Sequence, residues 1–221
     1  MTAHHHHGAG HAAEDPHAHL SPTEYWEKRY SETERIWSGK VNASLAAVVG
    51  ELTPGTAIDL GCGEGGDVLW LAEQGWQAHG LDISETAVGR ARAEASARGS
   101  GTATFTATDL STWQPEPESV DLVTASFFQS NVALDRTAIL RRAMTALRPG
   151  GRLVTVSHAA PPSWAKDHPA TMVSVQDEAA QLGGSAEEWE VELAAERPRA
   201  ATAPDGSAGE HLDAVLVLQR R

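Results

Sequence analysis

Between residues 56 and 157, short apolar segments alternate with helical segments, and this alternation constrains the fold more than any other feature of the sequence. The fourth apolar segment is interrupted mainly by Asp121 and Thr124, which is typical of a buried parallel strand. The alternation predicts a parallel sheet with helices on both faces, connected by right-handed crossovers. The five expected strands are Thr56–Leu60, Gln77–Asp82, Ala103–Ala107, Val120–Ser126 and Arg152–Ser157.

The connections between these strands predict helices with recognisable ends. One helix runs from Val68 to Gln74 and ends at Gly75, where glycine allows a left-handed cap. A second begins after Ser84, whose side chain is a suitable N-cap. A third spans Arg136–Leu147 and is stopped by Pro149-Gly150-Gly151.

The C-terminal region predicts a different kind of pairing. Trp189–Glu196 and Asp213–Arg220 each alternate polar and apolar residues, and the turn-rich stretch Pro204-Asp205-Gly206 separates them. This pattern predicts a closing pair of antiparallel strands. The region Pro161–Gly184 is expected to be a loop with a short helix around Asp177–Leu182. The predicted fold is therefore α/β: a Rossmann-like, doubly wound, mostly parallel seven-stranded sheet with a C-terminal antiparallel strand pair.

The N-terminal part of the chain differs in character from the rest. Residues 1–20 are rich in histidine, alanine and glycine without periodicity, which predicts a disordered tail. Residues 21–221 are expected to form one domain, in which residues 21–50 make a helical lid that begins at the N-cap Ser21. The tail histidines could bind Ni, Zn or Cu, but consecutive histidines in a flexible segment hold no defined geometry.

The composition narrows the classes of partner. The formal net charge of -13 repels phosphate backbones, so a small-molecule ligand is expected rather than a nucleic acid. A single cysteine excludes Cys-rich zinc sites, and no metal is expected in the chemistry. No apolar run approaches the roughly 18 residues of a membrane helix, so we expect no membrane contact and a cytoplasmic location. The oligomeric state stays open.

The first predicted strand leads directly into the glycine loop, Asp59-Leu60-Gly61-Cys62-Gly63-Glu64-Gly65. Ligands of open parallel sheets bind at the carboxyl ends of the strands, and glycines permit backbone angles and close approaches that a side chain would block. The spacing of Gly61, Gly63 and Gly66 also matches the dinucleotide fingerprint. The glycines alone therefore fit a nicotinamide cofactor as well as other ligands.

Carboxylates around the glycine loop favour a cationic ligand. Asp59 and Glu64 would oppose the pyrophosphate of a dinucleotide, whereas they would attract a sulfonium ion and an amino group. Asp82 ends the second predicted strand, where a carboxylate can bind both hydroxyls of a ribose. That position suits either cofactor.

Four segments, in order and at matching spacing, resemble the motifs of class I S-adenosylmethionine-dependent methyltransferases. They are the glycine loop, Leu81-Asp82-Ile83-Ser84, Thr108-Asp109-Leu110 and Leu147-Arg148-Pro149-Gly150-Gly151, and the resemblance runs from Pro22 to the C-terminus. Each motif alone is common, but the ordered set is specific. The resemblance implies transfer of a methyl group from S-adenosylmethionine to a small-molecule acceptor.

The resemblance also implies a binding site for this cofactor. Asp82 would hold the ribose beside Ile83, and Asp109 would accept a hydrogen bond from the adenine amino group beside the Leu110 backbone. Ala125 would lie beside the methionine part. The remaining implied contacts come from the glycine loop: Asp59, Gly61, Cys62, Gly63 and Gly65.

A narrower resemblance concerns the lid. The segment Trp26-Glu27-Lys28-Arg29-Tyr30, followed by Trp37, is similar to the N-terminal element of the thiopurine S-methyltransferase and tellurite-resistance branch. This similarity implies that the element folds over the cofactor, with Trp26 and Trp37 in the site and the Trp37 ring facing the sulfonium. The alternative is that these rings only pack a helix onto the core. The branch favours a thiol, a chalcogen or another soft nucleophile as acceptor.

Methyl transfer needs little acid–base assistance, because alignment of the acceptor with a strong electrophile can supply most of the rate. No catalytic residue is assigned, although His158 is either a candidate general base or a histidine that hydrogen-bonds the following loop. Cys62 is expected to be a packing residue rather than a nucleophile. Phe127–Asn131 and Pro161–Gly184 are expected to shape the acceptor pocket. An NAD(P)-dependent oxidoreductase and a metal-binding protein acting through the histidine tail remain alternatives.

Overall fold

The computed structural model describes residues 20–164 and 172–221. The predicted histidine-rich tail, apart from residue 20, lies outside the described residues, so its disorder and its metal affinity remain predictions. Among the helices of the described ranges, none combines the length and the apolar character that a membrane span requires.

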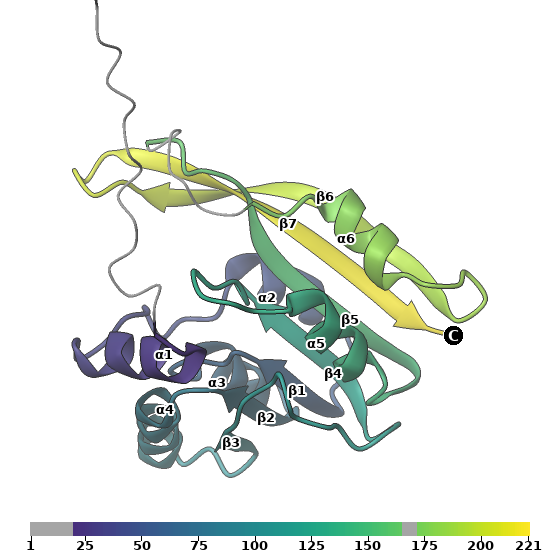
Figure 1. The fold of residues 1–221 in the computed structure, drawn as a ribbon, viewed down its shortest axis with the longest axis horizontal. Helices are drawn as coiled ribbons and strands as arrows, with labels where there is room; N and C mark the ends of the chain where they lie inside the picture. Colours follow the sequence, from purple (N-terminus) through teal and green to yellow (C-terminus); the bar gives the residue numbers. More distant parts are fainter. Residues whose placement is uncertain (1–19, 165–171) are drawn as a thin grey trace, which may run out of the picture.

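Seven strands form one sheet in the described chain (Figure 1). They are β1 (Thr56–Leu60), β2 (Gln77–Asp82), β3 (Ala103–Ala107), β4 (Val120–Ser126), β5 (Leu147–Ala160), β6 (Trp189–Thr202) and β7 (Ala208–Arg220). The order across the sheet is β3-β2-β1-β4-β5-β7-β6. Strands β1 to β5 are parallel to one another, whereas β7 is antiparallel to both β5 and β6. The predicted α/β fold with its C-terminal antiparallel pair is confirmed.

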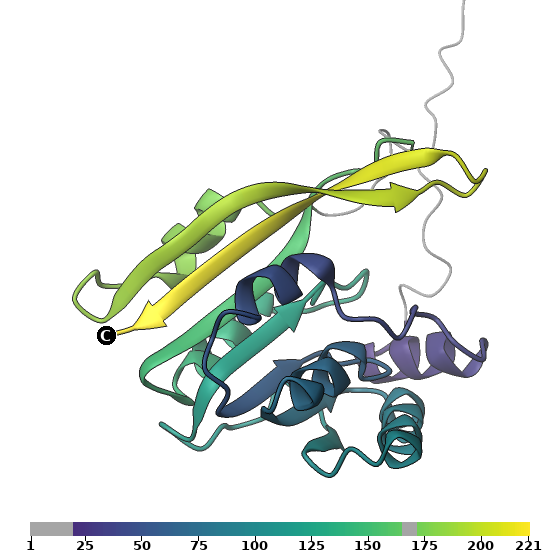
Figure 2. The same ribbon diagram turned by 180° about the vertical axis from the view of Figure 1, so that it is seen from behind.

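Helices cover both faces of this sheet. They are α1 (Pro22–Ser31), α2 (Ala43–Val49), α3 (Gly66–Glu73), α4 (Glu85–Arg98), α5 (Arg136–Met144) and α6 (Val175–Leu182). Buried side chains of α2, α3 and α4 form the core on one face, and those of α5 and α6 form the core on the other. Figure 2 shows α2 and α3 in front of the sheet, with α1 beside α4.

The two cores follow from the alternation of side chains along each strand. In β4, Leu122 packs into the core that contains Leu45 and Val68, whereas the next residue, Val123, packs into the core that contains Leu140. All five side chains are fully buried. A central parallel strand buried on both faces explains why its sequence is nearly continuous in apolar residues.

Several predicted boundaries are wrong. The helix predicted over Arg136–Leu147 ends at Met144, and β5 already begins at Leu147. Leu147 pairs with Val120 and is fully buried, so its packing in the sheet outweighs its helical preference. Strands β6 and β7 are longer than predicted, because their antiparallel ladder continues as far as the pair Thr202 and Ala208.

Candidate binding site at the carboxyl ends of the strands

The glycine loop leaves β1 at the point in the sheet where the strand order reverses. Gly61, Gly63 and Gly65 have φ values of 68°, 51° and 83°, which side chains rarely adopt. The backbone N–H groups of Gly61 and Cys62 both donate to the carbonyl oxygen of Leu81, at 2.8 and 3.0 Å. The loop is therefore held against the end of β2 by its own backbone.

Asp82 fixes the same loop through its side chain. One carboxylate oxygen accepts from the N–H of Gly63 at 2.8 Å, and the other accepts from the N–H of Ser84 at 2.9 Å. Burial raises the pKa of Asp82, although these backbone hydrogen bonds favour its charged form. The structure thus brings together two segments that the sequence assigned to one site.

A second acidic residue that sequence reasoning missed lies beside Asp59. The Thr124 hydroxyl donates to Asp59 at 2.5 Å, and Asp67, in the first turn of α3, accepts from the N–H of Asn42 at 2.8 Å. Burial, followed by the charge of Asp67, raises the pKa of Asp59 well above its ordinary value. Neither aspartate makes an ion pair with any described residue. A buried and a half-buried carboxyl group without a cation favour a positively charged ligand beside them.

Glu64 has a different role from the one the sequence suggested. Arg90 lies 3.0 Å from one of its carboxylate oxygens, and the other oxygen accepts from the N–H groups of Ile36 and Trp37 at 3.1 and 3.0 Å. The charge of this buried side chain is therefore already paired. Glu64 holds the lid against the loop, and the expectation that it attracts a cationic ligand is corrected.

The lid lies directly on the glycine loop. The Trp37 indole N–H donates to the Tyr30 hydroxyl at 3.0 Å, and a Cβ atom added to Gly63 would lie only 2.8 Å from that hydroxyl and 3.2 Å from the indole nitrogen. The Trp37 side chain nevertheless stays 48% exposed. Trp26 points elsewhere, because its indole N–H donates to the Ser130 hydroxyl at 3.2 Å. Of the two predicted tryptophans, the structure brings Trp37 to the loop and Trp26 to the segment after β4.

Helix α1 is also tied to the N-terminus of α4. The Ser84 hydroxyl donates to Glu27 at 2.6 Å, and the Thr86 hydroxyl makes a very short hydrogen bond to the same carboxylate. Although burial acts in the opposite direction, these hydrogen bonds hold the pKa of Glu27 below its ordinary value. Sequence reasoning missed Glu27 and Arg90 because their partners lie far away along the chain.

The remaining predicted residues follow the strand ends. Asp109 is exposed after β3, where it accepts from the Ser111 N–H at 2.8 Å, and Leu110 is buried. Ile83 is half-buried after β2, whereas Ala125 is fully buried within β4. Their places agree with the expected path of a cofactor along the strand ends, but their contacts with a cofactor stay predictions.

The thiol of Cys62 is buried beside Gly80, where a Cβ atom would lie 2.8 Å from its sulfur. Burial, with the charges of Asp82 and Asp59, raises its pKa well above the ordinary value. A buried, protonated thiol packs well and reacts poorly.

Within the described residues, no group of three or more histidine, cysteine, aspartate or glutamate side chains could hold a metal ion.

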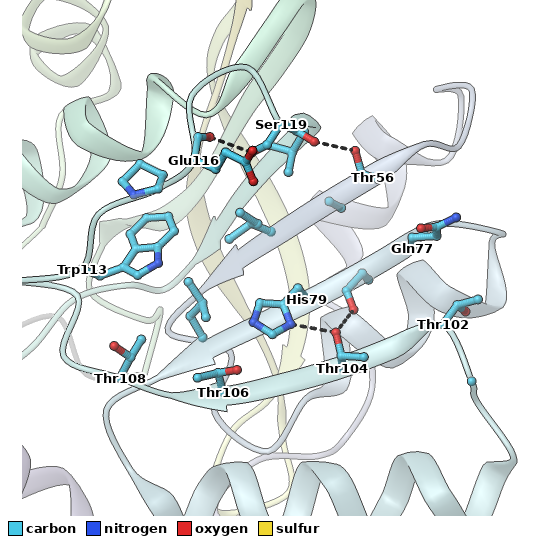
Figure 3. A pocket seen from close by; sticks show the side chains of 17 residues that line it. Thr56, Gln77, His79, Thr102, Thr104, Thr106, Thr108, Trp113, Glu116 and Ser119 are labelled. Carbon is cyan, nitrogen blue, oxygen red and sulfur yellow. Dashed lines mark hydrogen bonds between the residues drawn. The ribbon is translucent and has the colours of Figure 1, made fainter.

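A separate cavity of about 570 Å³ lies along β1, β2 and β3, where the connection to β4 forms no helix (Figure 3). Trp113 lies on one side of it, and Thr106 and Thr108 point into it from the opposite side. His79 and Thr104 make a hydrogen bond of 2.7 Å within its wall. None of the residues predicted to bind the cofactor lines this cavity.

Comparison with known proteins adds evidence from sequence. Residues 57–151 match the model of a family described as a methyltransferase domain. Probable thiol methyltransferase 2 of Arabidopsis thaliana is 35% identical over 136 residues, which cover 59% of this chain and 60% of that protein. Ribosomal RNA small subunit methyltransferase C of Alcanivorax borkumensis is 37% identical over 109 residues, which cover 48% of this chain and 33% of that protein. The chain therefore spans less than two thirds of either curated relative.

A solved structure extends the similarity beyond that segment. Its description reads "Conversion of a Disulfide Bond into a Thioacetal Group during Echinomycin Biosynthesis". The sequence of that protein is 25% identical to this chain, and the two structures superpose with a TM-score of 0.71. The match covers 90% of this chain and 92% of that one. It therefore extends well beyond residues 57–151.

Proposed function

Because the chain carries a methyltransferase domain and folds as a class I S-adenosylmethionine-dependent methyltransferase, we propose that it transfers a methyl group to a soft nucleophile on a small molecule. The observation that carries this proposal is the junction of β1 and β2, where Asp82 binds the backbone of the glycine loop. S-adenosylmethionine supplies the electrophilic methyl group. The protein would hold the donor and align the acceptor, which can supply most of the rate.

The residues at the junction fit this donor. The buried Asp59 and the half-buried Asp67 would provide negative charge for a ligand that carries a sulfonium and an ammonium group. Asp82 would accept from the ribose hydroxyls, and Asp109 from the adenine amino group. The Trp37 ring, next to Gly63, would face the sulfonium. Each of these roles is part of the proposal.

A thiol or another sulfur or chalcogen nucleophile is the acceptor class that we favour. The Arabidopsis relative is named a probable thiol methyltransferase, and the echinomycin structure is described as the conversion of a disulfide bond into a thioacetal group. Both descriptions concern sulfur chemistry.

Ribosomal RNA is a second candidate acceptor, because one relative is named a ribosomal RNA methyltransferase. That match covers only a third of the relative, and the net charge of -13 opposes binding to a phosphate backbone. The carboxyl groups of Asp59 and Asp67 likewise oppose the pyrophosphate of a nicotinamide cofactor. A small molecule, without nucleic acid or membrane, therefore remains our prediction, as does a cytoplasmic location.

An acceptor screen that measures release of S-adenosylhomocysteine tests the proposal. The screen contains thiols, selenite, tellurite, small amines and a structured ribosomal RNA fragment. We expect turnover with at least one thiol or chalcogen and none with the RNA. Turnover with RNA or amines alone would overturn the acceptor class, and NADH fluorescence enhancement without S-adenosylmethionine binding would overturn the methyl donor. Deletion of residues 1–19 should leave the cofactor affinity unchanged.

A further inference from the structure

Three rings lie in a row at the ends of β4, β5 and β7, beside a residue that contacts the glycine loop. Phe128 lies against the loop, since a Cβ atom on Gly61 would be 2.6 Å from its ring. The neighbouring Phe127 is stacked on His158, with ring centroids 4.3 Å apart and an interplanar angle of 27°. The His211 ring follows at 5.4 Å from His158. The Phe127, His158 and His211 rings thus form a row, and the backbone joins this row to the Phe128 ring at the glycine loop.

The backbone holds this row in a strained but defined geometry. Phe127 has a φ of 51°, a left-handed conformation that is uncommon for a bulky residue. Its N–H donates to the Val156 carbonyl oxygen at 2.6 Å, which joins the end of β4 to β5. The His158 N–H donates to the Gln129 side chain at 3.2 Å. Such strain persists where the surroundings determine the geometry, and it is concentrated at functional sites.

A buried ion pair sets the charge around the two imidazoles. Arg199 of β6 lies 2.7 Å from the fully buried Asp213 of β7, which also accepts from the Ser44 hydroxyl of α2 at 2.8 Å. The Arg199 guanidinium is 5.6 Å from the Phe127 ring centroid. Burial and then the charge of Arg199 lower the pKa of His211, although Asp213 acts in the opposite direction. These groups favour the neutral form of the His211 imidazole.

We propose that His158 is the general base that removes the proton of a thiol acceptor in the methyl transfer; this inference rests on the proposed function. The S–H bond of the acceptor breaks and its proton passes to the His158 imidazole. The sulfur lone pair then forms a bond to the methyl carbon as the bond from that carbon to the sulfonium breaks. The products are the methyl thioether and S-adenosylhomocysteine, and the proton leaves His158 for solvent. Phe127 and His211 are positioning residues that hold the His158 ring.

This assignment defines a substrate class. An ordinary thiol with a pKa of about 8.5 is mostly protonated at neutral pH and gains from a base. An aromatic thiol that is already ionised at neutral pH does not. The base should therefore matter only for acceptors whose reactive sulfur carries a proton.

The test compares His158→Gln with wild type across a series of thiols of increasing pKa. At pH 7 we expect kcat/KM to fall by about 100-fold for alkyl thiols but by no more than about threefold for an ionised nitro-substituted aromatic thiol. The acidic limb of the pH profile of kcat/KM, which reports the base, should disappear in the variant. The matched control is His79→Gln in the separate cavity, which should behave as wild type across the series.

Two outcomes overturn this inference alone. An equal loss for all thiols would mean that the His158 ring is only structural, and no loss for any thiol would mean that it is not the base. Titration of the variant with S-adenosylhomocysteine shows whether the donor site is intact, and an affinity within about twofold of wild type is expected. If wild-type protein methylates no thiol at all, the proposed acceptor class fails and this inference fails with it.

Discussion

At the scale of single residues, Asp59 combines a buried carboxyl group with a position at the start of the glycine loop. Its pKa is raised by burial and by the charge of Asp67, so the folded protein binds this proton more tightly than the unfolded chain does. The stability that this proton contributes is present in acid and is lost as the pH rises above the ordinary range of a carboxyl group. Asp59 therefore costs stability at neutral pH in the absence of a cationic ligand.

Asp59→Asn should raise the Tm of the ligand-free protein at pH 8 by about 2–4 °C, equivalent to about 1 kcal/mol for a chain of this length. Asparagine keeps an acceptor for the Thr124 hydroxyl and removes the buried charge. The same variant should bind S-adenosylmethionine about tenfold more weakly. Thermal unfolding from pH 5 to 9 and calorimetry provide the two measurements. A variant that is less stable than wild type throughout this range would contradict this account of Asp59.

Gly63→Ala isolates the contact between the loop and the lid. The added Cβ atom would lie 2.8 Å from the Tyr30 hydroxyl. The positive φ would itself cost a residue with a side chain about 1–2 kcal/mol. We expect the affinity for S-adenosylhomocysteine to fall by about tenfold or more. Gly99→Ala is the matched control, because Gly99 also has a positive φ but its Cβ atom would meet nothing within 4 Å. Equal affinities in the two variants would show that the contact is unimportant.

The sequence could predict the residues of this site whose role depends on position along a strand. Asp82 and the glycines could be placed together from the sequence because the ends of parallel strands share one edge of the sheet. Glu64 was misjudged, because its partner Arg90 lies 26 positions away and only the packing of α4 brings the two together. Asp67 could have been noticed as an acidic residue in the first turn of the helix that follows the loop.

At the scale of elements, the lid is held in place largely through α4. Arg90 donates to Glu64 at 3.0 Å and to the backbone carbonyl oxygens of Tyr30 and Thr33 at 2.9 and 2.6 Å. One guanidinium thus joins three segments that are distant in sequence: α4, the glycine loop and the end of α1.

Arg90→Ala should loosen the lid without unfolding the sheet. We expect the affinity for S-adenosylmethionine to fall by about tenfold, together with faster dissociation and a change in tryptophan fluorescence from Trp37. Arg98→Ala, on the same helix, removes only exposed contacts with Glu94 and Glu73. This variant should leave the affinity, the dissociation rate and the fluorescence unchanged. An Arg90 variant that binds and releases the donor as wild type does would show that the lid is held by other contacts.

The types and order of the elements could be predicted from the sequence, but some of their ends could not. Pro149-Gly150-Gly151 correctly indicated that the helix stops before it. The pattern could not show that Leu147 pairs with Val120, because this pairing joins the start of β5 to the start of β4, which lies much earlier in the chain. The extent of β6 and β7 likewise depends on the cross-strand ladder rather than on the alternation within each strand.

At the scale of the whole molecule, the sheet order places the proposed donor and acceptor regions side by side. The glycine loop follows β1, and the Phe127 segment follows its neighbour β4. The β6–β7 hairpin extends past the other strands on the side where α1 lies (Figure 1). The hairpin thereby brings Arg199 and His211 to the Phe127 and His158 rings. The acceptor side is therefore built from segments that are far apart along the chain, which explains why sequence motifs define it less well than the donor side.

The most direct test of the central claim is isothermal titration of S-adenosylmethionine into wild-type protein, the Asp82→Ala variant and an Asp177→Ala control on the exposed face of α6. We predict binding by wild type and by the control with equal affinity. Loss of the carboxylate that holds Gly63 should weaken binding in Asp82→Ala by at least about tenfold, or about 1.4 kcal/mol. Absence of binding to wild type at millimolar ligand, or unchanged affinity in Asp82→Ala, would contradict the assignment of the glycine loop and Asp82 as the methyl-donor site.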